Sequence, residues 1–312
     1  MTLTYCKQLL ILVCCAMSLS ACINEDTPPQ KAGSLTVSIA SRSDANAAQD
    51  EMMRRVRIII ARAGATSEAG VLYDETFTNL TDKESFTRTY GDLTNGTYDV
   101  YAIVNQPAEA SANVIPTYSS IELKTDPDSY VTGDGIPMTG KTTVTLSGKD
   151  EAVTLPVVRA VSKVNLVFDN TRKDDFTISS FTFGRFRPDK TWWWVDAADS
   201  QQGDAVPGAT YSGLSVTEPI TIKSGERYVF PTFYVYESKG LGDAYALTIV
   251  NAANPTDPFV LRLTDKDGQK MDCLRRNTCV NITVSIAKMS EIYLTYEVRP
   301  WDNRTVDVPD FQ

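Results

Sequence analysis

Apolar and polar residues alternate along most of the chain. In residues 34–41, Leu35, Val37 and Ile39 alternate with small or polar residues. Alternation with a period of two is typical of β-strands that bury one face. The pattern recurs in a series of short segments: 55–62, 97–105, 142–148, 152–168, 177–186, 219–224, 227–238, 245–251, 259–265, 279–288 and 291–301. The hydrophobic pattern therefore predicts an all-β chain.

Turn-forming pairs such as Asn95-Gly96 and Asp267-Gly268 separate many of these segments, and helix signals are weak. Short strands at such spacing indicate antiparallel β-sandwiches. A similar number of strands precedes and follows Asn170, so we expect two tandem sandwich domains, residues 34–170 and 171–312. Residues 152–168 form either one long strand or two strands in succession.

The N-terminal residues are typical of an export signal. An apolar run from Leu9 to Leu19 follows Lys7 and is too short for a permanent membrane span, which needs roughly 20 residues. The small residues directly before Cys22 resemble a bacterial lipobox, which predicts a signal peptide over 1–21, lipidation of Cys22 and a polar tether over 22–33. The alternative is an ordinary cleaved signal with a cysteine nearby.

Composition excludes several functions. The chain contains no histidine, which rules out Ser-His-Asp and Cys-His nucleophile activation. Its net charge of -9 argues against nucleic acid as a partner. No phosphate-binding glycine loop or metal-binding cluster is recognisable, and the acidic stretch 125–135 is interpreted as a solvated loop rather than a calcium site. We therefore expect no enzymatic activity, no cofactor and no metal.

Two cysteines remain in the mature chain beyond Cys22. Cys273 and Cys279 lie close together in the sequence. In an exported protein such a pair predicts either a disulfide that closes a small loop or two buried thiols. The sequence does not decide between them.

Three consecutive tryptophans, Trp192, Trp193 and Trp194, are a second candidate feature. In a strand their side chains would point to both faces, so at least one ring would be exposed or covered by a loop. One interpretation is an adhesive or glycan-stacking surface, because exposed aromatic residues favour interfaces. The other is a core contact on one face and a loop contact on the other.

The two ends of the chain suggest an exchange of strands between subunits. The first strand, with Leu35, Val37 and Ile39, is followed by Arg42 and a polar connection before the next strand. At the other end, Pro300 interrupts the last strand, and Val306, Val308 and Phe311 form a short apolar tail over about 300–312. A removable strand and a spare strand favour donation of the tail to a neighbouring subunit, since an added strand supplies backbone hydrogen bonds.

At this point the chain resembles the fimbrillin family, the subunits of type V pili that are made as lipoprotein precursors. The matching motifs are spread over nearly the whole chain in the family's order. They are the lipobox, the first strand with an arginine soon after it, "LTNGTYDVYAIVN" (93–105), "IPMTG" (136–140), "VVRAVSKVNL" (157–166), "FPTFYVYES" (230–238), "LRRNTCVNITVSI" (274–286) and "VRPW" (298–301).

The resemblance implies two transthyretin-like β-sandwich domains and export to the outer membrane as a lipoprotein. It also implies proteolysis after Arg42, loss of the first strand (34–41), and filling of the resulting groove by a neighbour's C-terminal strand. The partners implied are other fimbrial subunits, in a homopolymer or a hetero-assembly, and a host or bacterial surface ligand. The alternatives are a fimbrial anchor that keeps its lipid, or a surface lipoprotein that binds glycans through Trp192–Trp194.

Overall fold

The computed structural model describes residues 33–40, 52–65, 68–80, 85–106, 122–124, 135–183, 186–188, 190–192, 205–207, 218–237, 245–264, 271, 274–288 and 291–300. These residues are almost entirely β-strand, and their only helical element is one 3-10 turn, Glu68–Gly70. None of the described helical structure is long and apolar enough to cross a membrane. The predicted all-β class is confirmed.

The first group of strands forms two facing sheets. The smaller sheet has the order β4-β1-β8 and contains β1 (Gly33–Ala40), β4 (Ser85–Leu93) and β8 (Glu151–Pro156). The larger sheet has the order β3-β2-β5-β7-β9 and contains β2 (Val56–Arg62), β3 (Val71–Phe77), β5 (Gly96–Val104), β7 (Met138–Leu146) and β9 (Val158–Arg159).

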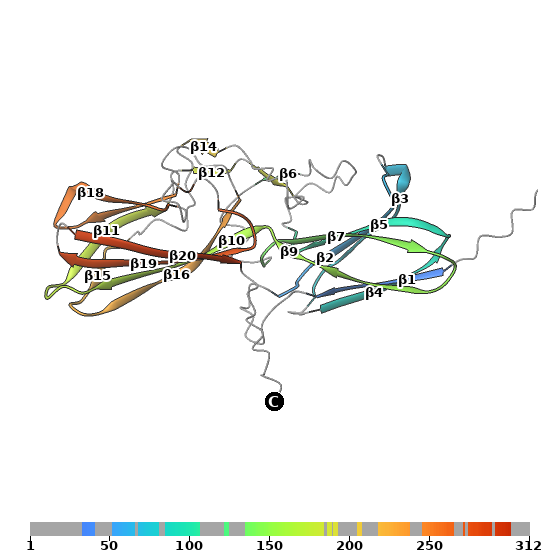
Figure 1. The fold of residues 1–312 in the computed structure, drawn as a ribbon, viewed down its shortest axis with the longest axis horizontal. Helices are drawn as coiled ribbons and strands as arrows, with labels where there is room; N and C mark the ends of the chain where they lie inside the picture. Colours follow the sequence, from blue (N-terminus) through green and yellow to red (C-terminus); the bar gives the residue numbers. More distant parts are fainter. Residues whose placement is uncertain are drawn as a thin grey trace, which may run out of the picture.

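The second group also forms two sheets and follows the first along the long axis of the molecule (Figure 1). One has the order β16-β10-β19-β20 and contains β10 (Val161–Asn170), β16 (Arg227–Tyr236), β19 (Thr278–Lys288) and β20 (Glu291–Pro300). The other has the order β15-β11-β17-β18 and contains β11 (Phe176–Phe183), β15 (Ile220–Ile222), β17 (Ala246–Asn251) and β18 (Asn254–Arg262).

Two short ribbons complete the described strands. One pairs β12 (Phe186–Pro188) with β14 (Ala205–Pro207), and the other pairs β13 (Lys190–Trp192) with β6 (Glu122–Lys124). The structure resolves the predicted strand at 152–168 into three in succession, β8, β9 and β10. Residues 161–170, which the sequence interpretation assigned to the first unit, pair with β16 and β19 of the second group.

The sandwiches depart from purely antiparallel pairing at two places. Strand β1 runs parallel to β8, and β10 runs parallel to β19. In each case the two strands are joined by a long excursion of the chain through both sheets, not by a hairpin, and such a connection allows parallel pairing. Alternation in the sequence identifies strands but carries no information on their direction relative to distant neighbours.

The two sandwiches repeat one topology. In chain order β1, β2, β3, β4, β5, β7 and β8 occupy the same sheet positions as β10, β11, β15, β16, β17, β18 and β19. Strands β5 and β17 even end in similar sequences, "YAIVN" (101–105) and "LTIVN" (247–251). The second sandwich differs by β20, which pairs with the outer edge of β19, and by the lack, among the described strands, of a counterpart to β9, which pairs with β7. Strand β1 is thus the counterpart of β10.

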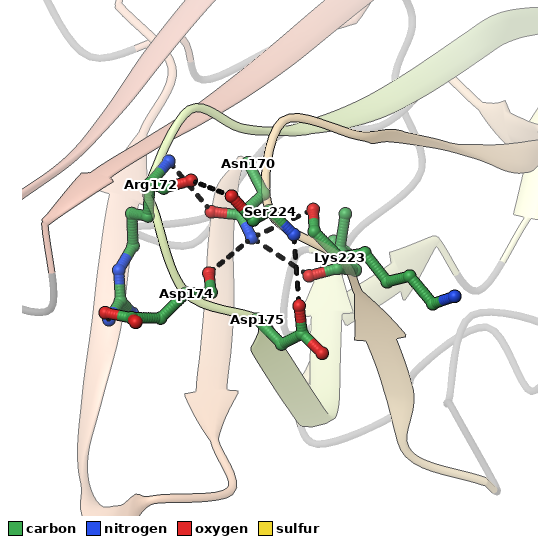
Figure 2. Close-up of polar contacts among 7 residues, drawn as sticks. Asn170, Arg172, Asp174, Asp175, Lys223 and Ser224 are labelled. Carbon is green, nitrogen blue, oxygen red and sulfur yellow. Dashed lines mark hydrogen bonds and ion pairs between the residues drawn. The ribbon is translucent and has the colours of Figure 1, made fainter.

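Strand β10 is tied to its surroundings at its C-terminal end through Asn170 (Figure 2). The buried Asn170 amide nitrogen donates to the carbonyl oxygens of Asp174 at 3.0 Å, Ile222 at 2.9 Å and Lys223 at 3.1 Å. Its side-chain oxygen accepts from the Arg172 backbone N–H at 3.2 Å. One side chain therefore satisfies backbone groups of two turns that would otherwise be buried without partners.

Candidate strand-exchange site

Strand β1 is the central strand of the smaller sheet in the first sandwich. It pairs antiparallel with β4 along Gly33–Ala40 and parallel with β8 from Leu35 to Ala40. In this sheet β4 and β8 have no neighbour other than β1 among the described strands. Removal of β1 would therefore leave two separated strands, each with an unpaired edge facing an open groove.

The inward face of β1 is part of the hydrophobic core. Leu35, Val37 and Ile39 are each 0% exposed and belong to the core cluster. The predicted burial of these three residues is thus what the structure shows. Burying three aliphatic side chains contributes roughly 5–9 kcal/mol, at about 1.5–3 kcal/mol each. An empty groove would expose the apolar surface that these side chains cover.

The outward face of β1 carries hydroxyl groups that hydrogen-bond across the sheet. Thr36 shares a hydrogen bond of 3.0 Å with Thr89, and Ser38 shares one of 3.1 Å with Thr87. These side-chain pairs lie opposite each other in the β1–β4 register. Cross-strand Thr–Thr and Ser–Thr pairs of this kind stabilise a register.

The N-terminal end of β1 is fixed by the turn between β7 and β8. Asp150 accepts hydrogen bonds from the Ser34 backbone N–H at 3.0 Å and from the Ser34 hydroxyl at 2.8 Å. A Cβ atom at Gly33 would lie 2.7 Å from the carbonyl oxygen of Lys149. Glycine is therefore required where the strand enters the sheet.

A polar notch lies between β3 and β4. It consists of Tyr90, which is opposite Leu35 in the register, and Glu75 of β3. The Tyr90 hydroxyl and the Glu75 Oε2 atom are both buried, and neither has a hydrogen-bond partner among the residues that the structure describes. Burial raises the pKa of the Tyr90 phenol well above its ordinary value, and the nearby Glu75 carboxylate acts in the same direction.

The side chain of Arg88 brings a positive charge to this notch. Its Nε lies 3.5 Å from Glu75 Oε2, and its guanidinium stacks over the rings of Phe77 and Tyr90. The Arg88 side chain is 49% exposed. The ion pair is therefore long and solvated, and such pairs contribute little to stability.

The connection from β1 to β2 contains Arg42, the predicted cleavage site, which lies outside the described residues. The two arginines before β2 are tightly held. The Asn105 side-chain oxygen accepts from the backbone N–H groups of Arg54 at 2.9 Å and Arg55 at 3.4 Å. The carbonyl oxygens of Arg54 and Arg55 accept from the backbone N–H groups of Leu80 and Asn105.

Asn105 itself is completely buried and has a positive φ of 53°. Its amide nitrogen donates to the carbonyl oxygens of Met52 at 2.9 Å and Ile136 at 3.1 Å. Asparagine tolerates this left-handed conformation better than most residues. The asparagine directly after β5 therefore anchors the chain just before β2 to the rest of the sandwich.

Several residues of the predicted sites lie outside the part of the chain that the structure describes. They are Cys22, Cys273, Trp193, Trp194, Val306, Val308 and Phe311. Trp192 ends β13, but its side chain is not described. Cys279 is buried, and because Cys273 is not described, the pairing of Cys273 with Cys279 stays a prediction. No group of three or more potential metal ligands occurs among the described residues.

The sequence interpretation missed the residues that surround β1. Asp150, Thr87, Thr89, Tyr90 and Glu75 come from segments distant in the sequence, and only strand pairing brings them to β1. One signal was available, because Thr87 and Thr89 continue the alternation of a strand whose outer face is polar.

Comparison with known proteins identifies solved structures with the same fold. No protein-family model matches the sequence, and no curated protein matches it. Among solved structures, a candidate cell adhesion protein from Bacteroides eggerthii DSM 20697 is 16% identical and covers 88% of this chain and 97% of its own, with a TM-score of 0.64.

Two further structures are fimbrial proteins of Porphyromonas gingivalis. The tip fimbrial protein Mfa3, with a C-terminal truncation, is 11% identical over 86% of this chain and 100% of its own, with a TM-score of 0.60. The fimbrilin FimA of strain W83 is 12% identical over 86% and 97%, with a TM-score of 0.59. The predicted resemblance is thus confirmed at the level of the fold, and the chain has the architecture of fimbrial and candidate cell adhesion proteins.

Proposed function

We propose that the protein is a structural subunit of a cell-surface fimbria. It is exported as a lipoprotein through Cys22, matured by cleavage after Arg42 and polymerised by strand exchange. The observation that carries this proposal is the position of β1, which is central in its sheet but first in the folded chain. A single cut in the β1–β2 connection frees a whole central strand, whereas its counterpart β10 is joined to the chain at both ends.

The energetics favour refilling of the groove. Loss of β1 removes three fully buried side chains and leaves unpaired backbone groups on β4 and β8. A strand with alternating apolar residues from another copy restores both sets of interactions. A head-to-tail contact of this kind does not close on itself and therefore builds a filament.

Cleavage at Arg42 is favoured over cleavage at Arg54 or Arg55. A protease must bind its target segment in an extended form with free backbone groups. The backbone groups of Arg54 and Arg55 are hydrogen-bonded to Asn105 and Leu80 of the sandwich. Cutting there would require local unfolding ahead of β2, which is buried over nearly its whole length.

The C-terminal tail is the proposed donor, with Val306 and Val308 in place of the inward residues of β1. The fimbrial fold of the solved structures supports a filament role for this chain. In the precursor the occupied groove prevents premature assembly. Lipidation at Cys22 would deliver this capped form to the outer membrane, and the cut would release lipid and β1 together.

N-terminal sequencing of the assembled protein tests the proposal. We expect mature copies to begin at Ser43, and Arg42→Ala should block both cleavage and assembly. Arg62→Ala, a change at an exposed residue at the end of β2, serves as the control and should leave both intact. If every assembled copy still begins at acylated Cys22, the protein is instead a retained anchor and the exchange of β1 does not occur.

A further inference from the structure

The C-terminal tail shares part of the sequence pattern of β1, with two identical residues in seven aligned positions. Residues 34–40 are SLTVSIA, and residues 303–309 are NRTVDVP. Aligned without a gap, Thr36 and Val37 match Thr305 and Val306, and Ile39 matches the β-branched Val308. Arg304 takes the place of Leu35. The tail lies outside the described residues, so this correspondence is one of sequence.

We infer that the tail of a second copy of this chain occupies the groove of β1 in this register, and that Arg304 is recognised by Glu75 and Tyr90. The inference rests on the proposed function and deepens it. It assigns the donor segment to 303–309, makes the chain its own partner, and identifies a residue that distinguishes the donor from the strand it replaces.

The outward face of the groove accepts the tail in this register. In this register each outward position of the tail would lie opposite a group with which it can hydrogen-bond. Asn303 would face the Asp150 carboxylate, which now accepts from Ser34. Thr305 would face the Thr89 hydroxyl and Asp307 the Thr87 hydroxyl, which now pair with Thr36 and Ser38. Asp302 falls at Gly33, where a Cβ atom would collide with the backbone of Lys149, so pairing begins at Asn303.

A register in which each site of β1 is filled by the tail residue two positions further toward the C-terminus is much less favourable. It would place Val306 at the site of Leu35, Pro309 at that of Ser38 and Asp310 at that of Ile39. Proline in the middle of a central strand removes a ladder hydrogen bond. The Ile39 site is 0% exposed, and a carboxylate buried there without a partner is costly. In the inferred register Pro309 lies at the end of the strand.

The notch between β3 and β4 suits an arginine at the Leu35 position. Tyr90 lies opposite this position, and its hydroxyl and Glu75 Oε2 are buried without hydrogen-bond partners among the described residues. Arginine can bury its aliphatic stem in the core and extend its guanidinium to a carboxylate near the surface. The Glu75 side chain is 36% exposed, so the notch opens toward solvent.

The other charged residues around the notch leave Glu75 able to form a further ion pair with Arg304. Asp74 is already paired with Arg57, whose Nε and Nη2 each lie 2.7 Å from the carboxylate oxygens. Arg88 approaches Glu75 only at 3.5 Å and is half exposed. Arg304 would therefore supply a second partner for a carboxylate oxygen that has no hydrogen bond while Leu35 fills the site.

Disulfide trapping tests the register and the identity of the partner. Chains of residues 22–312 with Cys22→Ala are prepared as two separate variants, Thr89→Cys and Thr305→Cys. The two variants are mixed and cleaved with an arginine-specific protease. We expect a disulfide-linked dimer, since Thr36 and Thr89 lie directly opposite each other in the precursor. A mixture of Thr89→Cys and Asp307→Cys chains is the matched control and should not cross-link.

A coupling experiment tests the role of Arg304. The dissociation rate of matured polymers is measured for the wild type, Glu75→Gln, Arg304→Leu and the double variant. We expect Glu75→Gln to speed dissociation about 5- to 20-fold with the wild-type tail and to have little effect in the Arg304→Leu background, because a direct charged pair gives such coupling. Equal effects of Glu75→Gln in both backgrounds would overturn the recognition by Arg304.

The outcomes separate this inference from the proposed function. Cross-linking of the Asp307→Cys chain instead of the Thr305→Cys chain would overturn the register but keep strand exchange. Polymers that form without either cross-link would show that a different segment fills the groove. If cleavage occurs and β1 dissociates but no polymer forms, the proposed function itself fails.

Discussion

Replacing Leu35 by alanine tests whether β1 belongs to the precursor alone. Leu35 is fully buried in the core of the first sandwich. A Leu→Ala change at such a site costs about 2–5 kcal/mol, because it removes apolar contacts and leaves a cavity. The uncut precursor should lose stability by this amount, whereas the matured polymer, which no longer contains residue 35, should be unchanged.

Urea unfolding of both forms measures the difference. With a slope of about 2 kcal/mol per molar urea, the unfolding midpoint of the first sandwich in the precursor should fall by about 1–2.5 M. Leu166→Ala is the matched control. Leu166 is equally buried on β10, the counterpart of β1 in the second sandwich, so this change should lower the midpoint in precursor and polymer alike.

One result would refute the reasoning. If Leu35→Ala destabilises the assembled polymer as much as the precursor, β1 is still in its groove after assembly. The same measurement on the cut but unassembled chain shows when β1 leaves. There the effect of Leu35→Ala should persist until the strand dissociates.

Three further changes follow from the buried polar groups. Asn170→Asp should destabilise the second sandwich by about 2–4 kcal/mol in urea unfolding, because a carboxylate would face the three carbonyl oxygens to which the amide now donates. Asp74→Ala should cost the first sandwich about 3 kcal/mol, since it leaves the buried Arg57 guanidinium without its ion pair, whereas the exposed Asp257→Ala should have no effect. Tyr90→Phe should leave the precursor as stable or slightly more stable at neutral pH, because it removes a hydroxyl without a hydrogen bond. Folding raises the pKa of the Tyr90 phenol above its unfolded value of about 10, so the wild type loses stability as the pH rises above that value. Tyr90→Phe should therefore lose less stability than the wild type in urea unfolding at alkaline pH. Equal losses of stability would contradict the burial of a neutral phenol at Tyr90.

The sequence was sufficient to predict most of the strands, but it missed β3 and β4 and did not predict which strands are neighbours. The alternation of Leu35, Val37 and Ile39 identified β1 and its buried face, because side-chain direction in a strand is a local property. The parallel pairing of β1 with β8 could not be predicted, since it depends on where the chain returns after passing through both sheets. Residues 161–170 show the same limit: their alternation marks a strand, but only pairing with β16 and β19 assigns it to the second sandwich.

The candidate site was predicted only in part for the same reason. The strand whose removal we propose was identified from the sequence, whereas the groove proposed to receive a donor is lined by β4, β8 and the turn at Asp150. Tyr90 and Glu75 carry no sequence signal of their own, because an unsatisfied hydroxyl or carboxylate is recognised only from its surroundings. Asn105 is an intermediate case: its place at the end of a strand is part of the motif 93–105, but its bonds to the segment before β2 were not predictable.

The repeated topology explains why the first sandwich, and not the second, is suited to exchange. Strands β1 and β10 have the same neighbours in their sheets, and both bury their inward side chains completely. Strand β10 has a folded chain on both sides and is tied through Asn170 to two turns. In the part of the chain that the structure describes, strand β1 is followed but not preceded by other strands of the sandwich. Under the proposed exchange, the same structural position would be permanent in one sandwich and replaceable in the other, and the difference would come from the order of the strands along the chain.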